Sequence, residues 1–344
     1  MKRGREELDD KVRTRRFYNA CKDGDVKHVL DFIRTGVDVN AGDEESRTVL
    51  HYASLYGRGD VAKVLIQNGA DVNAVSKFKL NALHRAAERG RDDIAKVLIQ
   101  NGADVNAVTK FKLTPLHYAA LKGHVDVAKM LIQNGADVNA VDEDKSTALH
   151  CAAWDGHVDV AKVLIQNGAD VNAVDEDNVT ALHRAACDGH VDVAKVLIQN
   201  GADVNVVYKY RRKSGTPLHD AAKNRHVVCT LQLLCFGAPI DKKALEDDKT
   251  DLLGPINNRM KLLRAGKRPG TSLMSNEERR FMWNLAFSFT IQHRAAAYKT
   301  YYTIRSFITF HGIFMAGGYD LDEESVWKRI IEVSSEEESS DANW

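Results

Sequence analysis

Residues 142–174 read DEDKSTALHCAAWDGHVDVAKVLIQNGADVNAV, and residues 175–207 read DEDNVTALHRAACDGHVDVAKVLIQNGADVNVV. The two stretches are equally long and differ at only a few positions, so the chain contains an internal repeat of 33 residues. A period of about 20 to 50 residues is the signature of elongated proteins in which each repeat packs on its neighbours. This repeat therefore decides the fold.

The same period continues in both directions along the chain. Three more copies precede the quoted pair, and a weaker copy lies before them, with Phe17 in the place of a leucine. A last copy follows and carries three extra residues within the stretch 208–214. The predicted repeats, numbered 1 to 7 in chain order, are 10–42, 43–75, 76–108, 109–141, 142–174, 175–207 and 208–243.

Each repeat encodes two short helices. In repeat 4, Thr114 is a good N-cap and Pro115 suits the first helical position, where a missing N–H costs nothing. Gly123 interrupts this helix, and residues 125–133 have apolar side chains at helical spacing. Gly135 ends the second helix, because glycine adopts a left-handed cap without steric cost. Two such helices cannot bury their own faces, so we expect successive repeats to stack.

Three motifs at this period resemble the ankyrin-repeat family: Thr-Pro-Leu-His-Tyr-Ala at 114–119, the Gly-His pair, and Gly-Ala-Asp-Val-Asn-Ala. The resemblance covers about two-thirds of the chain. It implies an all-α fold, a solenoid of helix–turn–helix units joined by β-turns. The many charged residues of repeat 1 predict a polar cap, which the end of an open array needs.

Histidines recur at fixed places in the repeats. A metal site or a catalytic site would need histidines brought together by the fold, whereas this spacing reflects the repeat period. The resemblance implies instead that the first set bonds neighbouring backbone and ties one repeat to the next. We therefore expect no metal, no cofactor and no catalytic residue in the array. The two sets are His51, His84, His117, His150, His183 and His219, and His124, His157 and His190.

The composition excludes several classes of protein. Lys plus Arg and Asp plus Glu both number 48, so net charge points to no nucleic acid or acidic substrate. No run of 18 apolar residues predicts a membrane span, and the start of the chain lacks the apolar core of a signal peptide. An odd set of cysteines without a Cys-x-x-Cys pair is typical of reduced thiols, which predicts the cytosol or the nucleus. The cysteines are Cys21, Cys151, Cys187, Cys229 and Cys235.

Binding residues of a solenoid are sought where the repeats differ from one another. On the first helix, the positions just after the histidine and just before the glycine change from repeat to repeat. The resemblance implies that these positions line a concave groove that contacts a partner protein. Trp154 has two interpretations, a core residue or an exposed contact. The exposed contact is favoured, because the predicted core positions are Leu, Ala and Val and because Trp is enriched at binding hot spots. The predicted groove contacts are Tyr52, Leu55, Tyr56, Arg85, Glu88, Arg89, Tyr118, Leu121, Lys122, Trp154, Asp155, Arg184 and Asp188, with Cys151 and Cys187 at equivalent positions.

The turns between repeats also vary, in blocks of one charge. Exposure to solvent explains the charged residues of any single turn. Exposed Phe between lysines in the turns, or tips, of two adjacent repeats instead predicts a surface that is both apolar and cationic. We therefore expect a partner with acidic and aromatic contacts near repeats 3 and 4. The predicted tip contacts are Lys77, Phe78, Lys79, Lys110, Phe111 and Lys112, together with Tyr208, Tyr210 and Arg211 of repeat 7. Acidic tips stand in repeats 2, 5 and 6.

The asparagine of the Asp-Val-Asn turn is a candidate for modification. Some members of the resembled family are hydroxylated at this asparagine, with a leucine eight residues earlier. An asparagine that bonds its own turn explains the same residues without modification. The candidates are Asn73, Asn106, Asn139 and Asn172, with Leu65, Leu98, Leu131 and Leu164.

The two ends of the chain lie outside the repeats. Residues 1–9 are a polar segment, and residues 244–271 predict closing helices and a linker. Residues 272–330 hold many of the aromatic side chains. Apolar residues alternate at period two from Phe281 to Ile291, which indicates a strand, whereas a Ser-x-x-Glu capping box at Ser275 and the alanines at 295–297 favour the helices that we expect there. Residues 331–344 are acidic and serine-rich, a composition typical of disorder.

The sequence favours a non-enzymatic adaptor that binds a partner protein through the groove and tips. The alternative is a substrate-recognition subunit of a ubiquitin ligase that docks through the C-terminal helices. An enzyme would have to use residues 272–330, where His293, Tyr298, Tyr301 and His311 form no motif. We expect no membrane and no small-molecule substrate as partner. The acidic tips disfavour nucleic acid, although the Lys-Phe-Lys tips resemble basic-aromatic binding elements.

Overall fold

The computed structural model describes residues 2–210, 213–236, 238 and 246, and these form fourteen α-helices and two short β-strands. They fall into two compact parts that divide between Ser214 and Gly215. The first part contains α1 (Lys2–Asp23), α2 (Val26–Arg34), α3 (Val49–Tyr56), α4 (Gly59–Gln67), α5 (Ala82–Arg89), α6 (Asp92–Gln100), α7 (Pro115–Leu121), α8 (Val125–Gln133), α9 (Ala148–Trp154), α10 (Val158–Gln166), α11 (Ala181–Asp188) and α12 (Val191–Gln199). The strand β1 (Tyr208–Tyr210) pairs with β2 (Lys213–Gly215), and the second part contains α13 (Pro217–Lys223) and α14 (Val227–Cys235).

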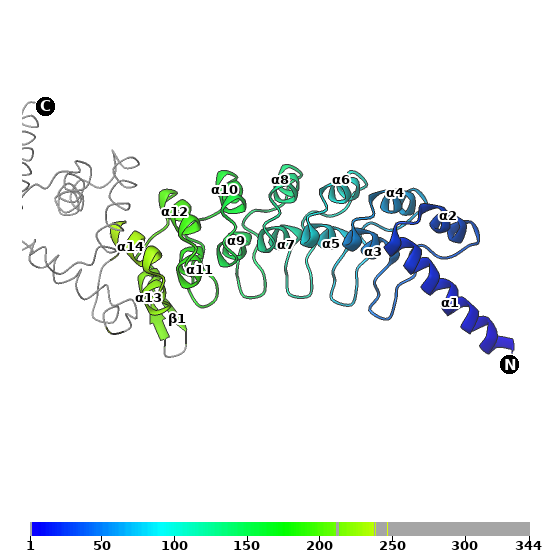
Figure 1. Cartoon of the computed structure of the whole chain (residues 1–344), viewed down its shortest axis with the longest axis horizontal. Coiled ribbons are helices and arrows are strands. Elements are labelled where there is room, and N and C mark those ends of the chain that lie inside the picture. The colour runs from blue at the N-terminus through cyan, green and yellow to red at the C-terminus, as the bar shows by residue number, and fades with distance from the viewer. Residues whose placement is uncertain (1, 211–212, 237, 239–245, 247–344) are drawn as a thin grey trace, which may run out of the picture. The chain divides into compact units, whose positions relative to one another are not determined.

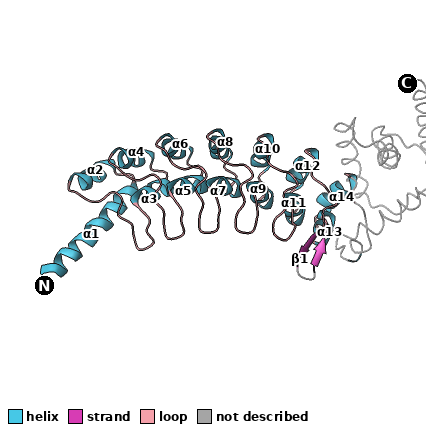
Figure 2. Cartoon of the chain, turned by 180° about the vertical axis from the view of Figure 1, so that it is seen from behind, coloured by secondary structure: helices cyan, strands magenta, loops and turns pink. Residues whose placement is uncertain are grey.

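The first part is a row of helix pairs (Figure 1). The odd-numbered helices from α1 to α11 pack side by side, and the even-numbered helices from α2 to α12 form a second row. Loops between successive repeats project from the odd-numbered row, on the side away from the even-numbered helices (Figure 2). We call these the tip loops; they comprise residues 43–47, 76–80, 109–113, 142–146 and 175–179.

The helix boundaries in repeat 4 follow the predicted signals. Thr114 is the N-cap of α7, its hydroxyl accepts the N–H of His117, and Pro115 occupies the first turn. The second helix, α8, has the predicted bounds of 125–133. Gly135 follows it with a φ of 87°, in the left-handed region that glycine enters freely. Local sequence therefore sets the length of both helices.

The core lies between the helices and consists of small and branched apolar residues. Leu131 on α8 and Ala119 on α7 are fully buried, and so are their counterparts in the neighbouring repeats. Alanine lets adjacent odd-numbered helices approach closely, while leucine fills the space between the two rows. Burial of one leucine side chain contributes about 1.5–3 kcal/mol, so the stacked repeats sum many such contributions.

The Asp-Val-Asn turns join each repeat to the next through hydrogen bonds. Asn106 donates from Nδ2 to the carbonyl of Gly135 (3.0 Å) and accepts the N–H of Asp137 at Oδ1 (2.8 Å). Asp104 orders the turn itself by accepting the N–H of Asn106 (2.9 Å). The same pair of bonds to the following repeat recurs at Asn40, Asn73, Asn139 and Asn172.

Repeat 1 differs from the others in its first helix. The helix α1 runs from Lys2 to Asp23, so it continues across the segment 1–9 that the sequence analysis treated separately. Phe17 is buried in the place of the leucine of later repeats, as predicted. The predictions for residues 244–271, 272–330 and 331–344 fall outside the described residues, except for Glu246.

Candidate protein-binding surface

The recurring histidines bond backbone in the adjacent repeat. His51 lies in the capping box of α3, where Nδ1 accepts the N–H of Thr48 (3.1 Å), and its Nε2 bonds the carbonyl of Leu80 in repeat 3 (2.8 Å). His84, His117 and His150 reach the next repeat in the same way. These bonds are the structural role that the family resemblance implied.

The second set of histidines bonds backward to the preceding repeat. The ring of His157 lies against Gly123, where a Cβ would stand only 2.5 Å from Nδ1. Gly123 also has a φ of 73°, so two independent constraints require glycine. His157 Nε2 bonds the carbonyl of Leu121 (3.1 Å), and His124 and His190 repeat this contact. The Gly-His pairs are therefore joints between repeats.

The tip loops are held by hydrogen bonds within and between repeats. In repeat 5, Asp142 Oδ1 accepts the N–H groups of Asp144 (3.0 Å) and Ser146 (2.8 Å). Along the row, Phe78 and Phe111 each accept a backbone N–H from the next tip loop, at 2.9 and 3.0 Å. The backbone of these loops is thus ordered, which fixes where their side chains project.

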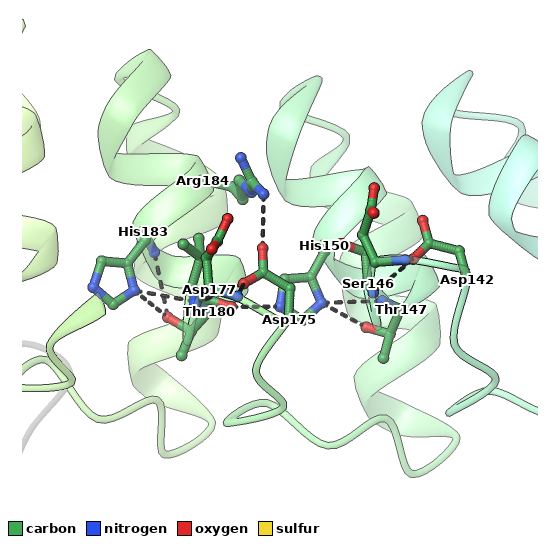
Figure 3. Close-up of polar contacts among 11 residues, drawn as sticks. Asp142, Ser146, Thr147, His150, Asp175, Asp177, Thr180, His183 and Arg184 are labelled. Atoms are coloured by element: carbon green, nitrogen blue, oxygen red, sulfur yellow. Dashed lines mark hydrogen bonds and ion pairs between the residues drawn. The ribbon is translucent and has the colours of Figure 1, made fainter. Parts of the chain in front are cut away.

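Two of the predicted groove residues bond the tip loop of their own repeat. Tyr52 donates its hydroxyl to Asp43 (2.7 Å), and Arg184 donates from Nη2 to Asp175 (2.8 Å), as Figure 3 shows for the latter. The residue after the histidine therefore faces the side of the tip loops. The positions just before the glycine lie beside them, because Tyr56 stacks on Tyr52, Glu88 pairs with Arg85, and Trp154 lies under Arg184. We call the surface formed by the tip loops and by both sets of predicted first-helix contacts, after the histidine and before the glycine, the tip-side face.

Trp154 is the largest exposed side chain among the predicted first-helix contacts. It is 49% exposed, as predicted, and the guanidinium of Arg184 lies 4.5 Å from the centre of its ring. Asp175 holds that guanidinium, and only 3% of the Asp175 side chain is exposed. A cation over an aromatic face contributes about 0.5–1 kcal/mol at an exposed site. The indole is thus fixed on one face by the next repeat.

Phe78 and Phe111 are exposed at two adjacent tips, as predicted. They are 48% and 51% exposed, which is unusual for phenylalanine. The flanking lysines are exposed as well, namely Lys77, Lys79, Lys110 and Lys112. The tips of repeats 3 and 4 therefore present apolar rings among cations.

A cluster of tyrosines lies at the repeat 2 end of the tip-side face. Tyr52 stacks on Tyr56, with ring centres 6.5 Å apart, and Lys22 Nζ lies 4.4 Å from the centre of the Tyr52 ring. Burial and the hydrogen bond to Asp43 raise the pKa of Tyr52 to about 12, so its hydroxyl is protonated and donates. Tyr56 is 45% exposed at the edge of the cluster.

The other predicted contacts have varied surroundings. Tyr118 packs edge-on against His84, and Tyr208 packs in the same way against His183, so both are partly buried. Arg85 pairs with Glu88 at 2.8 Å. Leu55 and Leu121 are half-buried, whereas Arg89, Lys122, Asp155 and Asp188 are exposed. Arg211 and the side chain of Tyr210 lie outside the described residues.

The candidate asparagines have exposed side chains that are nevertheless fully engaged. Asn73 both donates to Gly102 (2.9 Å) and accepts from Asp104 (2.9 Å), and the other three candidates make equivalent bonds. These bonds explain the asparagines as joints between repeats, and their modification stays a prediction.

Cys21, Cys151 and Cys229 form no disulfide. Burial raises the pKa of Cys151 to about 12, and burial has the same effect on Cys21 and Cys229. Within the described residues, no group of three His, Cys, Asp or Glu side chains is placed to hold a metal ion. No helix in that part of the chain is both long and apolar enough to cross a membrane.

The family described as ankyrin repeats (3 copies) matches residues 17–109, 83–175, 140–207 and 173–244. These overlapping matches run from residue 17 to residue 244, which is more than half of the chain. The chain is an ankyrin-repeat protein. Ankyrin repeats are in general protein–protein interaction modules, and the family is typically non-enzymatic. The predicted fold, an all-α ankyrin solenoid, is thereby confirmed.

One curated protein is similar to part of this ankyrin-repeat chain. Acyl-CoA-binding domain-containing protein 2 of Arabidopsis thaliana is 36% identical over 61 residues. The matched stretch covers 18% of this chain and 17% of that protein. The acyl-CoA in that name describes the Arabidopsis protein, and so short a match transfers no ligand to this array.

Sequence reasoning missed the carboxylates at the base of the ankyrin tips. Asp43 and Asp175 were seen only as part of acidic tips, yet they anchor Tyr52 and Arg184. The available signal was a spacing of nine residues, which recurs between Asp142 and Cys151. Side chains at the same position of each repeat point in the same direction. The spacing of nine residues therefore places the aspartate of the tip loop opposite the residue that follows the histidine.

Proposed function

We propose that this ankyrin-repeat protein is a non-enzymatic adaptor that binds a partner protein on the tip-side face. The observation that supports this most is the placement of exposed aromatic side chains. Phe78, Phe111 and Trp154 all project from the variable positions of that face, while the leucine and alanine core stays constant. Aromatic residues dominate binding hot spots because they bury much apolar area with little loss of entropy.

The opposite side of the array supports the same assignment. The exposed positions of the even-numbered helices from α4 to α12 repeat with little change, and α10 and α12 have the same nine-residue sequence. Three exposed lysines on these helices pair with an aspartate three residues earlier, as Lys162 does with Asp159 at 3.1 Å. Such surface pairs contribute little energy. The residues that vary between repeats are concentrated on the tip-side face, where a partner would contact them.

The test compares two variants of the full chain as affinity baits. The face variant carries Phe78→Ala, Phe111→Ala and Trp154→Ala, and the control variant carries Lys63→Ala, Lys96→Ala and Lys129→Ala on the even-numbered helices. Proteins captured by the unmodified chain are quantified by mass spectrometry. The proposal expects a defined set of proteins to be lost from the face variant and retained by the control. Equal capture by all three baits would refute it.

The location of the protein in the cytosol or nucleus stays a prediction. The ubiquitin-ligase alternative depends on residues after 246, which lie outside the described part of the chain. A chain truncated after Lys243 serves as a further bait. If it loses ligase scaffold components and keeps the other captured proteins, that alternative is favoured.

A further inference from the structure

The tip-side face has opposite net charges on its two halves. In repeats 3 and 4 it carries seven cations and one anion, and in repeats 5 and 6 it carries eight anions and two cations, so the net formal charges are +6 and −6. The whole chain has no net charge, so the separation is local. The first set is Lys77, Lys79, Arg85, Arg89, Lys110, Lys112, Lys122 and Glu88; the second is Asp142, Glu143, Asp144, Asp155, Asp175, Glu176, Asp177, Asp188, Lys145 and Arg184.

Each half also offers an apolar anchor. Phe78 and Phe111 stand among the lysines of the basic half, and Trp154 stands in the acidic half. A binding segment would therefore need apolar side chains together with negative charge on the basic half. It would need positive charge on the acidic half, where Trp154 suits contact with a cation or its aliphatic stem.

The carboxylate of Asp142 receives no side-chain hydrogen bond from its own repeat, unlike the aspartates at the same position in repeats 2 and 6. Asp43 receives a donor from Tyr52, and Asp175 receives one from Arg184. The matching position for Asp142 is Cys151, whose raised pKa of about 12 keeps the thiol neutral. Among the described residues, no side chain donates to the Asp142 carboxylate, and its bonds are two backbone N–H groups to one oxygen.

The dimensions of the face suit an extended segment. Packed helices lie about 8–10 Å apart, so two repeats span roughly 20 Å along the row. An extended chain advances about 3.3 Å per residue, and about six residues would therefore cover each half. The two halves together would accommodate about twelve extended residues.

We propose that the tip-side face binds an extended peptide segment of a partner protein that has an acidic, apolar half and a basic half. The acidic half lies on repeats 3 and 4, and the basic half lies on repeats 5 and 6, where a cationic side chain of the partner pairs with Asp142. This inference rests on the proposed function and adds the charge pattern of the partner. Complementary charge of this kind sets specificity and orientation.

The test uses the full chain and labelled synthetic peptides of about 14 residues, enough to span both halves. One peptide has a Glu/Leu half followed by a Lys/Gly half, a second has the reverse order, and a third has the same composition with alternating charges. Fluorescence anisotropy at about 50 and 150 mM NaCl reports affinity and its screening by salt. The proposal expects one of the block peptides to bind on the order of tenfold more tightly than the alternating peptide.

A substitution at Cys151 tests the placement of the basic half. Arginine occupies the equivalent position in repeats 3 and 6, as Arg85 and Arg184, so Cys151→Arg should fold and supply Asp142 with an internal guanidinium. Cys151→Arg should lower the affinity for the block peptide by about tenfold, whereas Cys151→Ala should change that affinity by less than about twofold. Far-UV circular dichroism checks that both variants fold.

Three results would overturn the inference. The alternating peptide could bind as tightly as both block peptides, or Cys151→Arg could leave the affinity unchanged. Sedimentation velocity could instead show a salt-sensitive dimer that Cys151→Arg dissolves, which would assign the face to a second copy of the chain. If the face variant still loses its natural partners while the peptides show no preference, this inference alone fails and the proposed function stands.

Discussion

Acidification should destabilise the array through the histidines of the capping boxes. His84 is the clearest case: its Nδ1 accepts the N–H of Asn81 (3.2 Å), and its Nε2 donates to the carbonyl of Leu113 (3.2 Å). Nδ1 also lies 2.7 Å from Asn81 Oδ1, so it is burial, and not the hydrogen-bond pattern, that favours the neutral ring. Burial lowers the pKa of His84 to about 4, and burial also lowers the pKa values of His51, His117 and His150.

The sign and size of the effect follow from proton linkage. Between the unfolded pKa of 6.5 and the folded pKa of about 4, the unfolded chain binds more protons at His84 than the folded chain does. The stabilisation is therefore complete above pH 6.5 and is lost as the pH falls toward 4. At about pH 5.5, one unit below the unfolded pKa, the protonated form of the unfolded histidine outnumbers the neutral form about ten to one. His84 alone therefore lowers the free energy of unfolding by about 1.4 kcal/mol. The other three histidines shift stability in the same direction.

Urea unfolding of the full chain, followed by far-UV circular dichroism at about pH 7.5 and 5.5, measures this loss. His84→Gln should reduce the loss between the two pH values by about 1.4 kcal/mol, whatever the variant costs at neutral pH. Asn73→Ala is the control, because it removes bonds between repeats without removing a titrating group. An identical pH loss in the unmodified chain and in His84→Gln would refute the reasoning.

Three further predictions concern stability. Ser54→Ala should raise the free energy of unfolding by about 1 kcal/mol in urea titrations, because Ser54 Oγ is fully buried and has no hydrogen-bond partner among the described residues. Asn106→Ala should lower the free energy of unfolding by about 1–3 kcal/mol, because it removes both the donor to Gly135 and the acceptor for Asp137. Phe78→Ala combined with Phe111→Ala should change the free energy of unfolding by less than about 0.5 kcal/mol while it weakens partner binding, because both rings are half exposed.

Much of the fold could be predicted because each repeat carries its own boundary signals. Thr114, Pro115 and Gly135 act locally, so the sequence alone placed α7 and α8. The exposure of Trp154 and Phe111 was predictable for a related reason: variable positions of a repeat are those that the core does not constrain.

Other features depend on contacts between elements and could not be predicted. The cation over Trp154 comes from Arg184 in the next repeat, and Asp175 holds it there. No spacing within one repeat reveals that contact. The partial burial of Tyr208 against His183 likewise follows from how the chain packs after repeat 6. Local sequence reports which residues vary, and only the packing reports which of them are already engaged.

The central claim is that the tip-side face contacts the partner, and site-specific photo-crosslinking tests it most directly. Benzoylphenylalanine replaces Phe111 in one form of the full chain, and in the other it replaces Lys129, which is exposed on α8 in the same repeat. Both forms are irradiated with the captured partner, and the crosslinked products are identified by mass spectrometry. The account predicts that the partner crosslinks at position 111 and not at position 129. Crosslinking at position 129 alone would contradict it.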